Sequence, residues 1–350
     1  PANKHMYPGE TLAEAAGHQV LYAFEPGEAG KPLIVFVPGD AHLARIFYGY
    51  PGGKSEDFVA HWVKQAGYSF LAVSYPLANP VFSEVVPAYT IKDWGNQVAA
   101  VIASVTKKNQ LSGPVIVAGW SMGGKIAASV GRAAKANGTD IAMFVAMSAD
   151  PPVPGFLPPA NVKSIKLDEN GYADRTPIYD WFLNAVTEQN TYNAHTIIPK
   201  NTYVEEFLGA VPIDLIDTGL VYENGELVSD IAKAIETSGA FSFSDYPFPV
   251  LVHDNSTSDF ENVLLDASDW SFVRNRVLVE RFMGERKPTD LSAGEWQQLQ
   301  LLVSASQQFF TEVVEGNHFF FIGEIGARKA MEKILTLHAR VDSLPKAAGN

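Results

Sequence analysis

The sequence predicts an α/β protein, with a mostly parallel central sheet flanked by helices and a large helical and loop insertion that acts as a cap. Three observations lead to this fold class. Short apolar runs alternate with segments of helical spacing over residues 1–150. A further apolar run, again followed by helical patterns, occupies residues 246–345. Between them, residues 151–245 mix short helical pieces, loops and scattered aromatic residues. We assign the first and last parts to one core domain and the middle part to a cap.

The core elements follow from these patterns. Continuous apolar runs are typical of strands buried on both faces, and they predict strands at 33–39, 70–76, 114–119, 141–147 and 248–253, with a last strand within 309–321. Helical spacing predicts helices at 57–67, 90–108, 120–136 and 325–341, with further helices between 254 and 305. Right-handed crossovers are expected for such a β/α series.

The composition limits the possible partners. The chain has 350 residues, of which 47% are hydrophobic and 19% charged, and its formal net charge is −13. No basic run offsets this charge, so we expect no nucleic-acid partner. No apolar stretch has transmembrane length, and the absence of cysteine rules out disulfides and thiolate chemistry. We expect a cytoplasmic protein, with a signal peptide removed before Pro1 as the alternative.

The stretch Gly119-Trp120-Ser121-Met122-Gly123 carries the strongest chemical signal. Ser121 lies between a predicted strand and a predicted helix, which is the context of a nucleophile elbow. A sharp turn there would place the serine in a strained conformation, and the flanking glycines would let the chain pass close to itself. We therefore predict Ser121 as a nucleophile.

A serine hydroxyl needs a base to take its proton. His318 is the best placed of the eight histidines, because it follows the last predicted strand and precedes the closing helix. His253, at the end of a strand, is the alternative. His338 lies within the last helix, and His42 and His61 come too early in the chain, although His42 could line the site.

Several aspartates could orient the histidine. Asp259 lies in the loop after the strand at 248–253, at a suitable distance from its end, and Asp254 lies in the same loop. Asp150 follows the strand at 141–147. Asp266 and Asp269 are further candidates. The sequence leaves these alternatives open, with Asp259 preferred.

An oxyanion needs backbone N–H donors. The N–H of Met122 lies at the start of a helix, where negative charge is favoured. The second donor should come from the loop after the strand at 33–39, which points to the N–H of Asp40 or Ala41. An acidic side chain beside an oxyanion is unusual, so Asp40 should point away or have a role of its own.

These residues resemble the α/β-hydrolase superfamily, through "VFVPGD", "GPVIVAGWSMGG", "FPVLVHD" and "EGNHFFF" in the expected order. Around Ser121 the chain is similar to the thioesterase domains of peptide and polyketide synthases, which commonly share the Gly-Trp-Ser-x-Gly-Gly elbow, a Pro-Pro after the next strand and Gly-x-His-Phe. In such thioesterases the acid often follows the strand that corresponds to 141–147 here, which keeps Asp150 among the candidates. Two features depart from the family. Ser148 stands where these domains usually have an aspartate, and the segment 254–305 is longer than expected.

The resemblance and the motifs imply a serine hydrolase that cleaves an ester or thioester of a mostly apolar acyl compound through an acyl-enzyme on Ser121. No metal-binding or phosphate-binding motif is present, so we expect no cofactor and a small-molecule substrate as partner. Tyr179, Trp181 and Phe182 would either line an apolar cleft or pack the cap on the core. The alternatives are an acyltransferase, a carbon–carbon bond hydrolase, or a non-catalytic receptor on the same scaffold. The oligomeric state is not indicated by the sequence.

Overall fold

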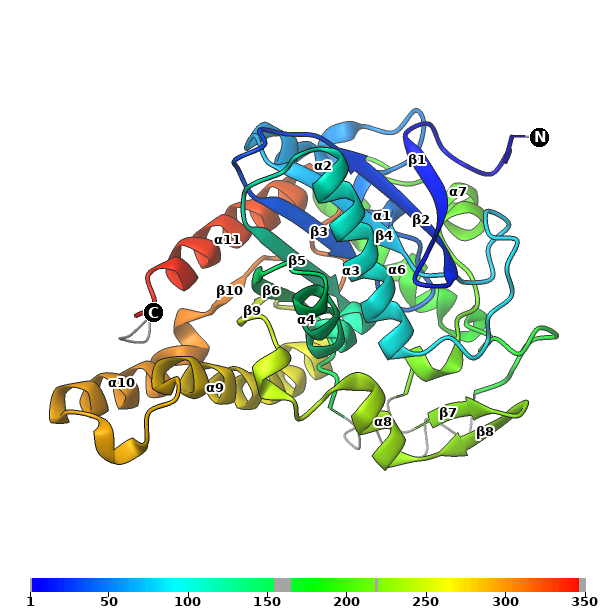
Figure 1. Cartoon of the computed structure of the whole chain (residues 1–350). Coiled ribbons are helices and arrows are strands. Elements are labelled where there is room, and N and C mark those ends of the chain that lie inside the picture. The colour runs from blue at the N-terminus through cyan, green and yellow to red at the C-terminus, as the bar shows by residue number, and fades with distance from the viewer. Residues whose placement is uncertain (1, 154–164, 218–219, 346–350) are drawn as a thin grey trace.

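The predicted α/β fold with a mostly parallel sheet is confirmed by the computed structural model, which describes residues 2–153, 165–217 and 220–345 (Figure 1). Eight strands form one sheet in the order β1-β2-β4-β3-β5-β6-β9-β10, and a separate two-stranded sheet pairs β7 with β8. From β4 to β10 all neighbours in the large sheet run parallel. The strands are β1 (Glu10–Ala15), β2 (His18–Glu25), β3 (Leu33–Val37), β4 (Ser69–Ser74), β5 (Val115–Trp120), β6 (Ile141–Met147), β7 (Leu220–Glu223), β8 (Glu226–Ser229), β9 (Pro249–His253) and β10 (Thr311–Val313).

The first two strands were not predicted from the sequence. β1 and β2 form an antiparallel hairpin at one edge of the sheet, and β2 also runs antiparallel to β4. Their tight turn places Ala16 and Gly17 at φ values of 50° and 84°, as a two-residue hairpin turn requires. Both strands mix buried and partly exposed residues, so they lack the continuous apolar run that marks the central strands.

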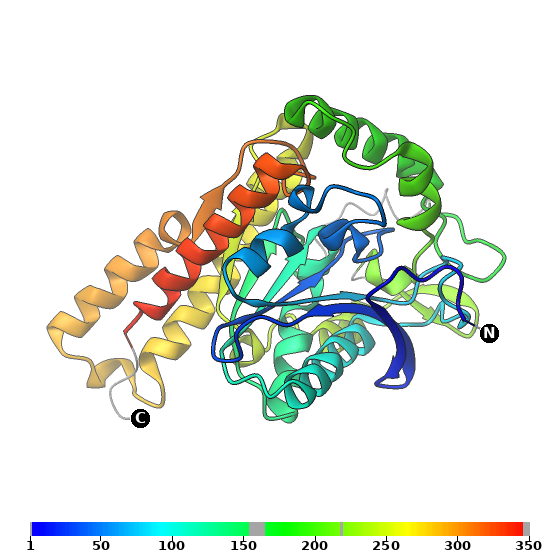
Figure 2. The same ribbon diagram turned by 90° about the horizontal axis from the view of Figure 1, so that it is seen from above.

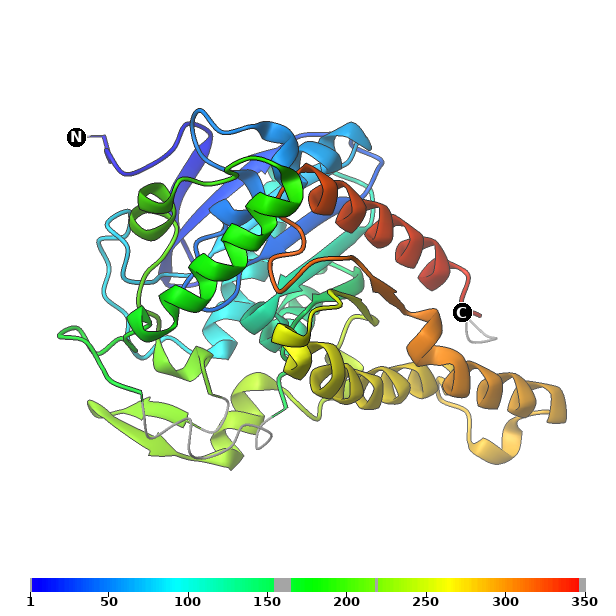
Figure 3. The ribbon, with the colours of Figure 1, turned by 180° about the vertical axis from the view of Figure 1, so that it is seen from behind.

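The helices cover both faces of the sheet. In Figure 1, α3 and α4 lie in front of the sheet, and they pack against each other. On the other face α11 packs against α2, and α11 faces the viewer in Figure 3. None of the helices in the described ranges is long and apolar enough to cross a membrane. The helices are α1 (Arg45–Tyr48), α2 (Val59–Gln65), α3 (Ile91–Lys108), α4 (Ala127–Ala136), α6 (Tyr179–Asn193), α7 (Lys200–Glu206), α8 (Ile231–Ser238), α9 (Ala267–Met283), α10 (Ala293–Phe309) and α11 (Glu324–Asp342).

Two long segments are inserted between strands of the sheet. The first runs from β6 to β9 and contains α6, α7, the β7–β8 hairpin and α8. It corresponds to the predicted cap, 151–245, of which residues 154–164 and 218–219 lie outside the described part. The second runs from β9 to β10 and contains α9 and α10, which pack side by side and extend from the body of the molecule (Figures 1 and 2). This hairpin explains the unusual length of the segment 254–305.

The parallel strands end together at one edge of the sheet. Val37 of β3 pairs with Gly119 of β5, and Trp120 of β5 pairs with Met147 of β6. Met147 in turn pairs with Val252 of β9. The loops that follow these strands therefore meet at one place, as in other open parallel sheets. These are the loops that carry the residues predicted to do chemistry.

A buried ion pair fixes the start of the chain on this sheet. Arg45 donates from Nε and from Nη2 to the two carboxylate oxygens of Glu10, both at 2.8 Å, and the two side chains are 1% and 0% exposed. Glu10 also accepts from the Tyr48 hydroxyl and from the backbone N–H of Tyr7. Arg45 lies over the Tyr7 ring at 3.6 Å. Because every charge here is compensated by its partner, loss of one partner is costly.

We predict that Glu10→Ala lowers the free energy of unfolding by about 3–5 kcal/mol, because it leaves the Arg45 guanidinium buried without its counter-charge. Urea denaturation followed by circular dichroism measures this change. Glu14→Ala, at an exposed position of the same strand, is the control and should change stability by no more than about 0.5 kcal/mol. Equal effects of the two substitutions would show that the ion pair contributes nothing beyond an ordinary surface residue.

Candidate active site

Ser121 occupies a strained turn between β5 and the helix that follows. Its φ is 53°, in the left-handed region that non-glycine residues rarely adopt. Close contacts explain the flanking glycines. A Cβ at Gly119 would lie 2.5 Å from the carbonyl O of Gly123, and one at Gly123 would lie 2.8 Å from that of Val37. The first turn after Ser121 is a 3-10 helix, Ser121–Ile126, which continues into α4. This geometry is that of the predicted nucleophile elbow.

Trp120 connects this elbow to the loop that carries His318. The Trp120 side chain is buried, and its Nε1–H donates to the carbonyl O of His318 at 2.9 Å. Its ring also lies against the His318 imidazole, with the ring centroids 5.3 Å apart. Since Trp120 directly precedes Ser121, the histidine loop is held beside the elbow. The predicted nucleophile and base are thus brought into one site.

The acid beside His318 is Asp259. His318 Nδ1 and Asp259 Oδ2 are 2.9 Å apart, and both side chains are 5% exposed. Burial by itself would lower the pKa of His318, but the nearby charges, that of Asp259 first, outweigh it, and the pKa is raised. The imidazole is therefore oriented through Nδ1 and stabilised in its charged form. These are the two things that the acid of a catalytic triad does for its base.

The other acid candidates do not bond to this ring in the described structure. Asp254 is buried and accepts a hydrogen bond from the Ser148 hydroxyl at 2.7 Å. Asp150 accepts from the Asn262 side-chain amide at 2.9 Å. Its backbone N–H donates to the Ser121 carbonyl, so Asp150 supports the elbow through its main chain.

Asp266 and Asp269 are held elsewhere. Asp266 accepts from the same Asn262 amide at 2.6 Å, and burial together with the charge of Asp150 raises its pKa to about 9. Asp269 lies on α9, and burial raises its pKa as well. A protonated Asp266 would not serve as a counter-charge for an imidazolium. The alternative base, His253, uses Nδ1 to bond to the carbonyl O of Asp254.

The acidic side chain in the oxyanion loop is neutralised by an ion pair. Arg175 approaches Asp40 with Nε at 3.0 Å and Nη2 at 2.5 Å from the carboxylate. The Tyr75 hydroxyl donates to the carbonyl O of Gly39 at 2.7 Å. In a planar trans peptide the N–H points opposite to the carbonyl, so the Asp40 N–H points away from Tyr75. A Cβ at Gly39 would lie 2.7 Å from the Ser121 Cβ, so this loop runs directly over the elbow.

His42 lines the site as a neutral ring. It is completely buried, its Nδ1–H donates to the carbonyl O of Asp40 at 2.8 Å, and its Nε2 accepts from the Tyr203 hydroxyl at 2.6 Å. Burial, opposed only by the bond to Asp40, lowers the pKa of His42 to about 3. A ring with both nitrogens occupied in this way does not act as a base. It holds the oxyanion loop in place.

Aromatic side chains surround the histidine. Phe182 is buried between His42 and Phe319, with ring centroids 4.9 Å and 5.8 Å away. Trp181 lies 5.4 Å from the His318 ring and is 40% exposed. Tyr179, on the same helix, is half-buried. Phe182 therefore packs α6 against the core, and Trp181 presents an open aromatic surface beside His318.

The sequence analysis did not identify two residues of this site, and it noted a third only as a difference from the thioesterase pattern. Arg175 and Tyr203 come from the inserted segment, and nothing in their sequence surroundings marks them as partners of Asp40 and His42. Ser148 was noted only because an aspartate is usual there. The structure places its hydroxyl on Asp254 and gives its backbone a φ of 39°.

The same residues could also hold a cation. Asp254, Asp259 and His318 each offer one ligand atom, and within the described ranges these atoms lie within 4.8 Å of one another. Oxygen and imidazole nitrogen donors of this kind suit several divalent metals. However, the Nδ1 of His318 is already engaged with Asp259, as a triad requires.

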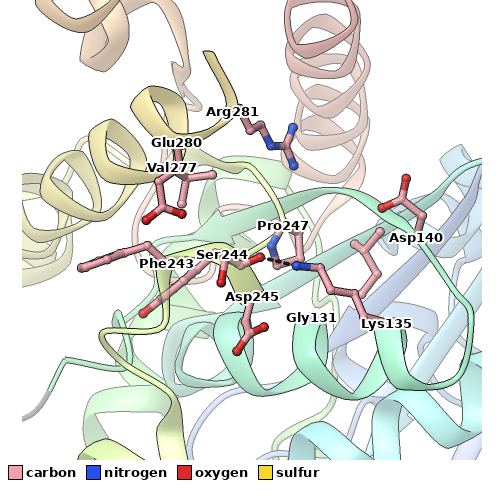
Figure 4. A pocket seen from close by; sticks show the side chains of 12 residues that line it. Gly131, Lys135, Asp140, Phe243, Ser244, Asp245, Pro247, Val277, Glu280 and Arg281 are labelled. Atoms are coloured by element: carbon pink, nitrogen blue, oxygen red, sulfur yellow. Dashed lines mark hydrogen bonds between the residues drawn. The ribbon is translucent and has the colours of Figure 1, made fainter. Parts of the chain in front are cut away.

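A cavity at the other end of the strands is separate from this site (Figure 4). It has a volume of about 310 Å³ and lies at the start of β6, whereas Ser121 follows the end of the parallel neighbour β5. Lys135 donates to the carbonyl O of Ser244, and Arg132 pairs with Asp245 at 2.9 Å. Several polar side chains around the cavity thus already bond to other parts of the protein. None of the triad candidates lines it.

Comparisons with known proteins find one family model and several solved structures of low sequence identity. The family model described as "Thioesterase domain" matches residues 49–157, which include the elbow. No relative is found among curated protein sequences. Among solved structures, MenH from S. aureus is 12% identical over 92% of this chain and 99% of its own, with a TM-score of 0.49. A bromoperoxidase from Bacillus anthracis is 14% identical over 95% and 99%, with a TM-score of 0.47. A thioesterase domain from the curacin biosynthetic pathway is 15% identical over 94% and 98%, with a TM-score of 0.38.

The predicted resemblance is confirmed. The strand order and the elbow are those of an α/β-hydrolase fold. The thioesterase model matches the part of the chain that contains the elbow.

We predict that the pKa of His318 is raised above its ordinary value and that Asp259→Asn lowers it, because the largest of the charges that oppose the effect of burial is removed. Imidazole nitrogen NMR over pH 5–9 measures both proteins. His195, whose pKa is raised by Asp57 at a separate site, is an internal control and should not change. An unaltered His318 pKa in the variant would contradict the assignment of Asp259 as its partner.

Proposed function

We propose that the protein is a serine hydrolase that cleaves an ester or thioester of a mostly apolar acyl compound. The observation that carries the proposal is the buried contact between His318 and Asp259, held next to the strained Ser121 by Trp120. A base that is oriented by a carboxylate and placed beside a serine is the arrangement that activates a hydroxyl nucleophile.

In the first half-reaction Ser121 Oγ attacks the acyl carbon while His318 Nε2 takes the hydroxyl proton. The Asp259 carboxylate stabilises the imidazolium formed in this step. The tetrahedral oxyanion accepts hydrogen bonds from the N–H groups of Met122 and Asp40. His318 then returns the proton to the departing alcohol or thiol, and the acyl group remains on Ser121.

In the second half-reaction water attacks the acyl-enzyme. His318 takes a proton from this water and afterwards gives it to Ser121 Oγ, so the free acid leaves and the enzyme is restored. The exposed face of Trp181, which packs on the buried Phe182 and Phe319, offers an apolar surface to the acyl group. A non-catalytic receptor on this scaffold would have no use for a buried charged pair beside a strained serine.

We predict that a fluorophosphonate probe labels the wild-type protein on one serine and does not label Ser121→Ala. His318→Ala should label at least about 10³-fold more slowly, because the hydroxyl loses its base. Gel fluorescence and mass spectrometry of the labelled peptide measure both effects. The same variants should lose hydrolysis of p-nitrophenyl esters and of acyl-thioesters.

Two matched substitutions serve as controls. Ser112→Ala and His61→Ala change the same residue types outside the site and should label like the wild type. If the folded wild-type protein fails to label at any pH, or labels on a serine other than Ser121, the proposed mechanism is wrong. Hydrolysis tested against transfer to an added alcohol separates a hydrolase from an acyltransferase.

Prolonged dialysis against EDTA should leave ester hydrolysis within about twofold of the untreated enzyme, because the triad supplies all of the proposed chemistry. Activity is measured before and after dialysis, together with the metal content. A loss of activity that zinc restores would instead assign Asp254, Asp259 and His318 as metal ligands.

A further inference from the structure

A second carboxyl group lies within 4.8 Å of the one that contacts His318. Asp254 follows β9, and its side chain is completely buried. Its carboxyl group lies close to that of Asp259, since the nearest ligand atoms of Asp254, Asp259 and His318 all lie within 4.8 Å of one another. The proposed mechanism gives Asp254 no task. A buried carboxyl group in contact with the triad therefore needs an explanation.

Asp254 is fixed where it stands. The Ser148 hydroxyl donates to its Oδ1 at 2.7 Å, and the Ser256 N–H donates to its Oδ2 at 3.0 Å. The Asp254 backbone N–H donates back to the Ser148 oxygen at 3.2 Å. Meanwhile Asp259 has the contact with His318 Nδ1. The Asp254 carboxyl group is thus fixed by contacts of its own, and Asp259 is the carboxylate that contacts the imidazole.

Two buried carboxyl groups within 4.8 Å of each other repel when both are ionised. A hydrogen bond between them requires a proton on one, because two ionised carboxylates are both acceptors. Asp259 accepts from the Nδ1–H of His318, and it must be charged to stabilise the imidazolium. The shared proton therefore belongs on Asp254. We propose that Asp254 is a positioning residue, which donates its carboxyl proton to Asp259, leaves a single negative charge on the pair and keeps Asp259 directed at His318. This inference rests on the proposed function.

The electrostatics agree with this placement. Burial, then the hydrogen bond to Asp259 and its charge, raises the pKa of Asp254 to about 7, against the opposing effect of Ser148 and Ser256. The ionisable groups around the pair are His318 from the last loop, Asp150 from the end of β6 and the neighbouring His253. His253 bonds through Nδ1 to the Asp254 carbonyl and not to its carboxyl.

A consequence for pH dependence follows. His318 must be neutral to accept a proton, so kcat/KM rises with pH through the pKa of His318. When Asp254 loses its proton near pH 7, the added negative charge raises the pKa of His318, because a nearby negative charge favours the imidazolium. The two groups titrate together, and the rising limb of the profile is moved to higher pH and broadened.

The test is Asp254→Asn, which keeps the shape and an N–H donor for Asp259 but cannot ionise. Ester hydrolysis and the rate of fluorophosphonate labelling are measured from pH 5 to pH 9. We expect the rising limb to become a single titration and to move down by about 0.5–1 pH unit, with most of the plateau rate retained. Asp254→Ala, which removes the donor, should lower kcat about 10–100-fold with little change in KM.

Asp214→Asn is the matched control, because Asp214 is also buried and its pKa is raised to about 6, but it bonds to the N–H of Ile91 away from the site. Its pH profile should equal that of the wild type. Ser148→Ala is a second probe of Asp254: it removes a donor that favours the ionised form, so the limb should move in the same direction as in Asp254→Asn.

The inference is overturned if Asp254→Asn and Ser148→Ala both keep the wild-type profile, or if Asp254→Asn loses as much activity as Asp259→Asn. The second result would make Asp254 the charged partner. A wild-type protein that does not label at any pH would instead refute the proposed function. If Asp254→Asn does not fold, two other measurements decide: the pH profile of Ser148→Ala and the NMR titration of His318 in the wild-type protein. A single-step titration of the wild-type His318 contradicts the shared proton.

Discussion

The hydrogen bond from the Trp120 indole to the His318 carbonyl is the contact on which the rest of the site depends. Ser121 and His318 are far apart in the chain, and each is delivered by a loop that follows its own strand. Trp120 is anchored on the sheet by β5, and it packs against Phe319 and Phe321 as well as His318. The rigid strand thereby sets the position of the histidine loop relative to the serine that comes directly after it. A residue with a smaller apolar side chain would fill neither role.

The inserted segment between β6 and β9 completes the site rather than only covering it. Arg175 neutralises Asp40, and Tyr203 holds His42, whose other nitrogen bonds to the Asp40 carbonyl. The main chain is joined there too, since the N–H of Leu43 donates to the carbonyl O of Phe207. The conformation of the oxyanion loop is therefore set jointly by the core and the insertion. The negative charge of Asp40 in this loop is compensated by Arg175 from the insertion.

The sequence predicted the central sheet and assigned Ser121, His318 and Asp259 to loops after its strands, and in the structure these loops meet at the carboxyl edge. These features depend on local patterns: continuous apolar runs, glycines around a sharp turn, and the order of elements along the chain. The β1–β2 hairpin was missed because half-exposed strands lack such runs. Arg175, Tyr203 and the role of Ser148 were missed for another reason. Each works through a partner distant in sequence, and a single sequence does not show which polar side chains meet in space.

The position of Asp259 shows that either of two neighbouring parallel strands can be followed by the carboxylate that contacts the histidine. The ends of β6 and β9 are joined by hydrogen bonds, including one from the N–H of Ser148 to the carbonyl O of Val252. A carboxylate that leaves either strand end can therefore reach the same histidine. Here β6 is followed by Ser148, which cannot be charged, and the loop after β9 supplies both Asp254 and Asp259. Two adjacent carboxylates in a buried place repel each other unless one is protonated. The Ser148 hydroxyl and the shared proton together explain how this site holds both aspartates and still presents one negative charge to the imidazole.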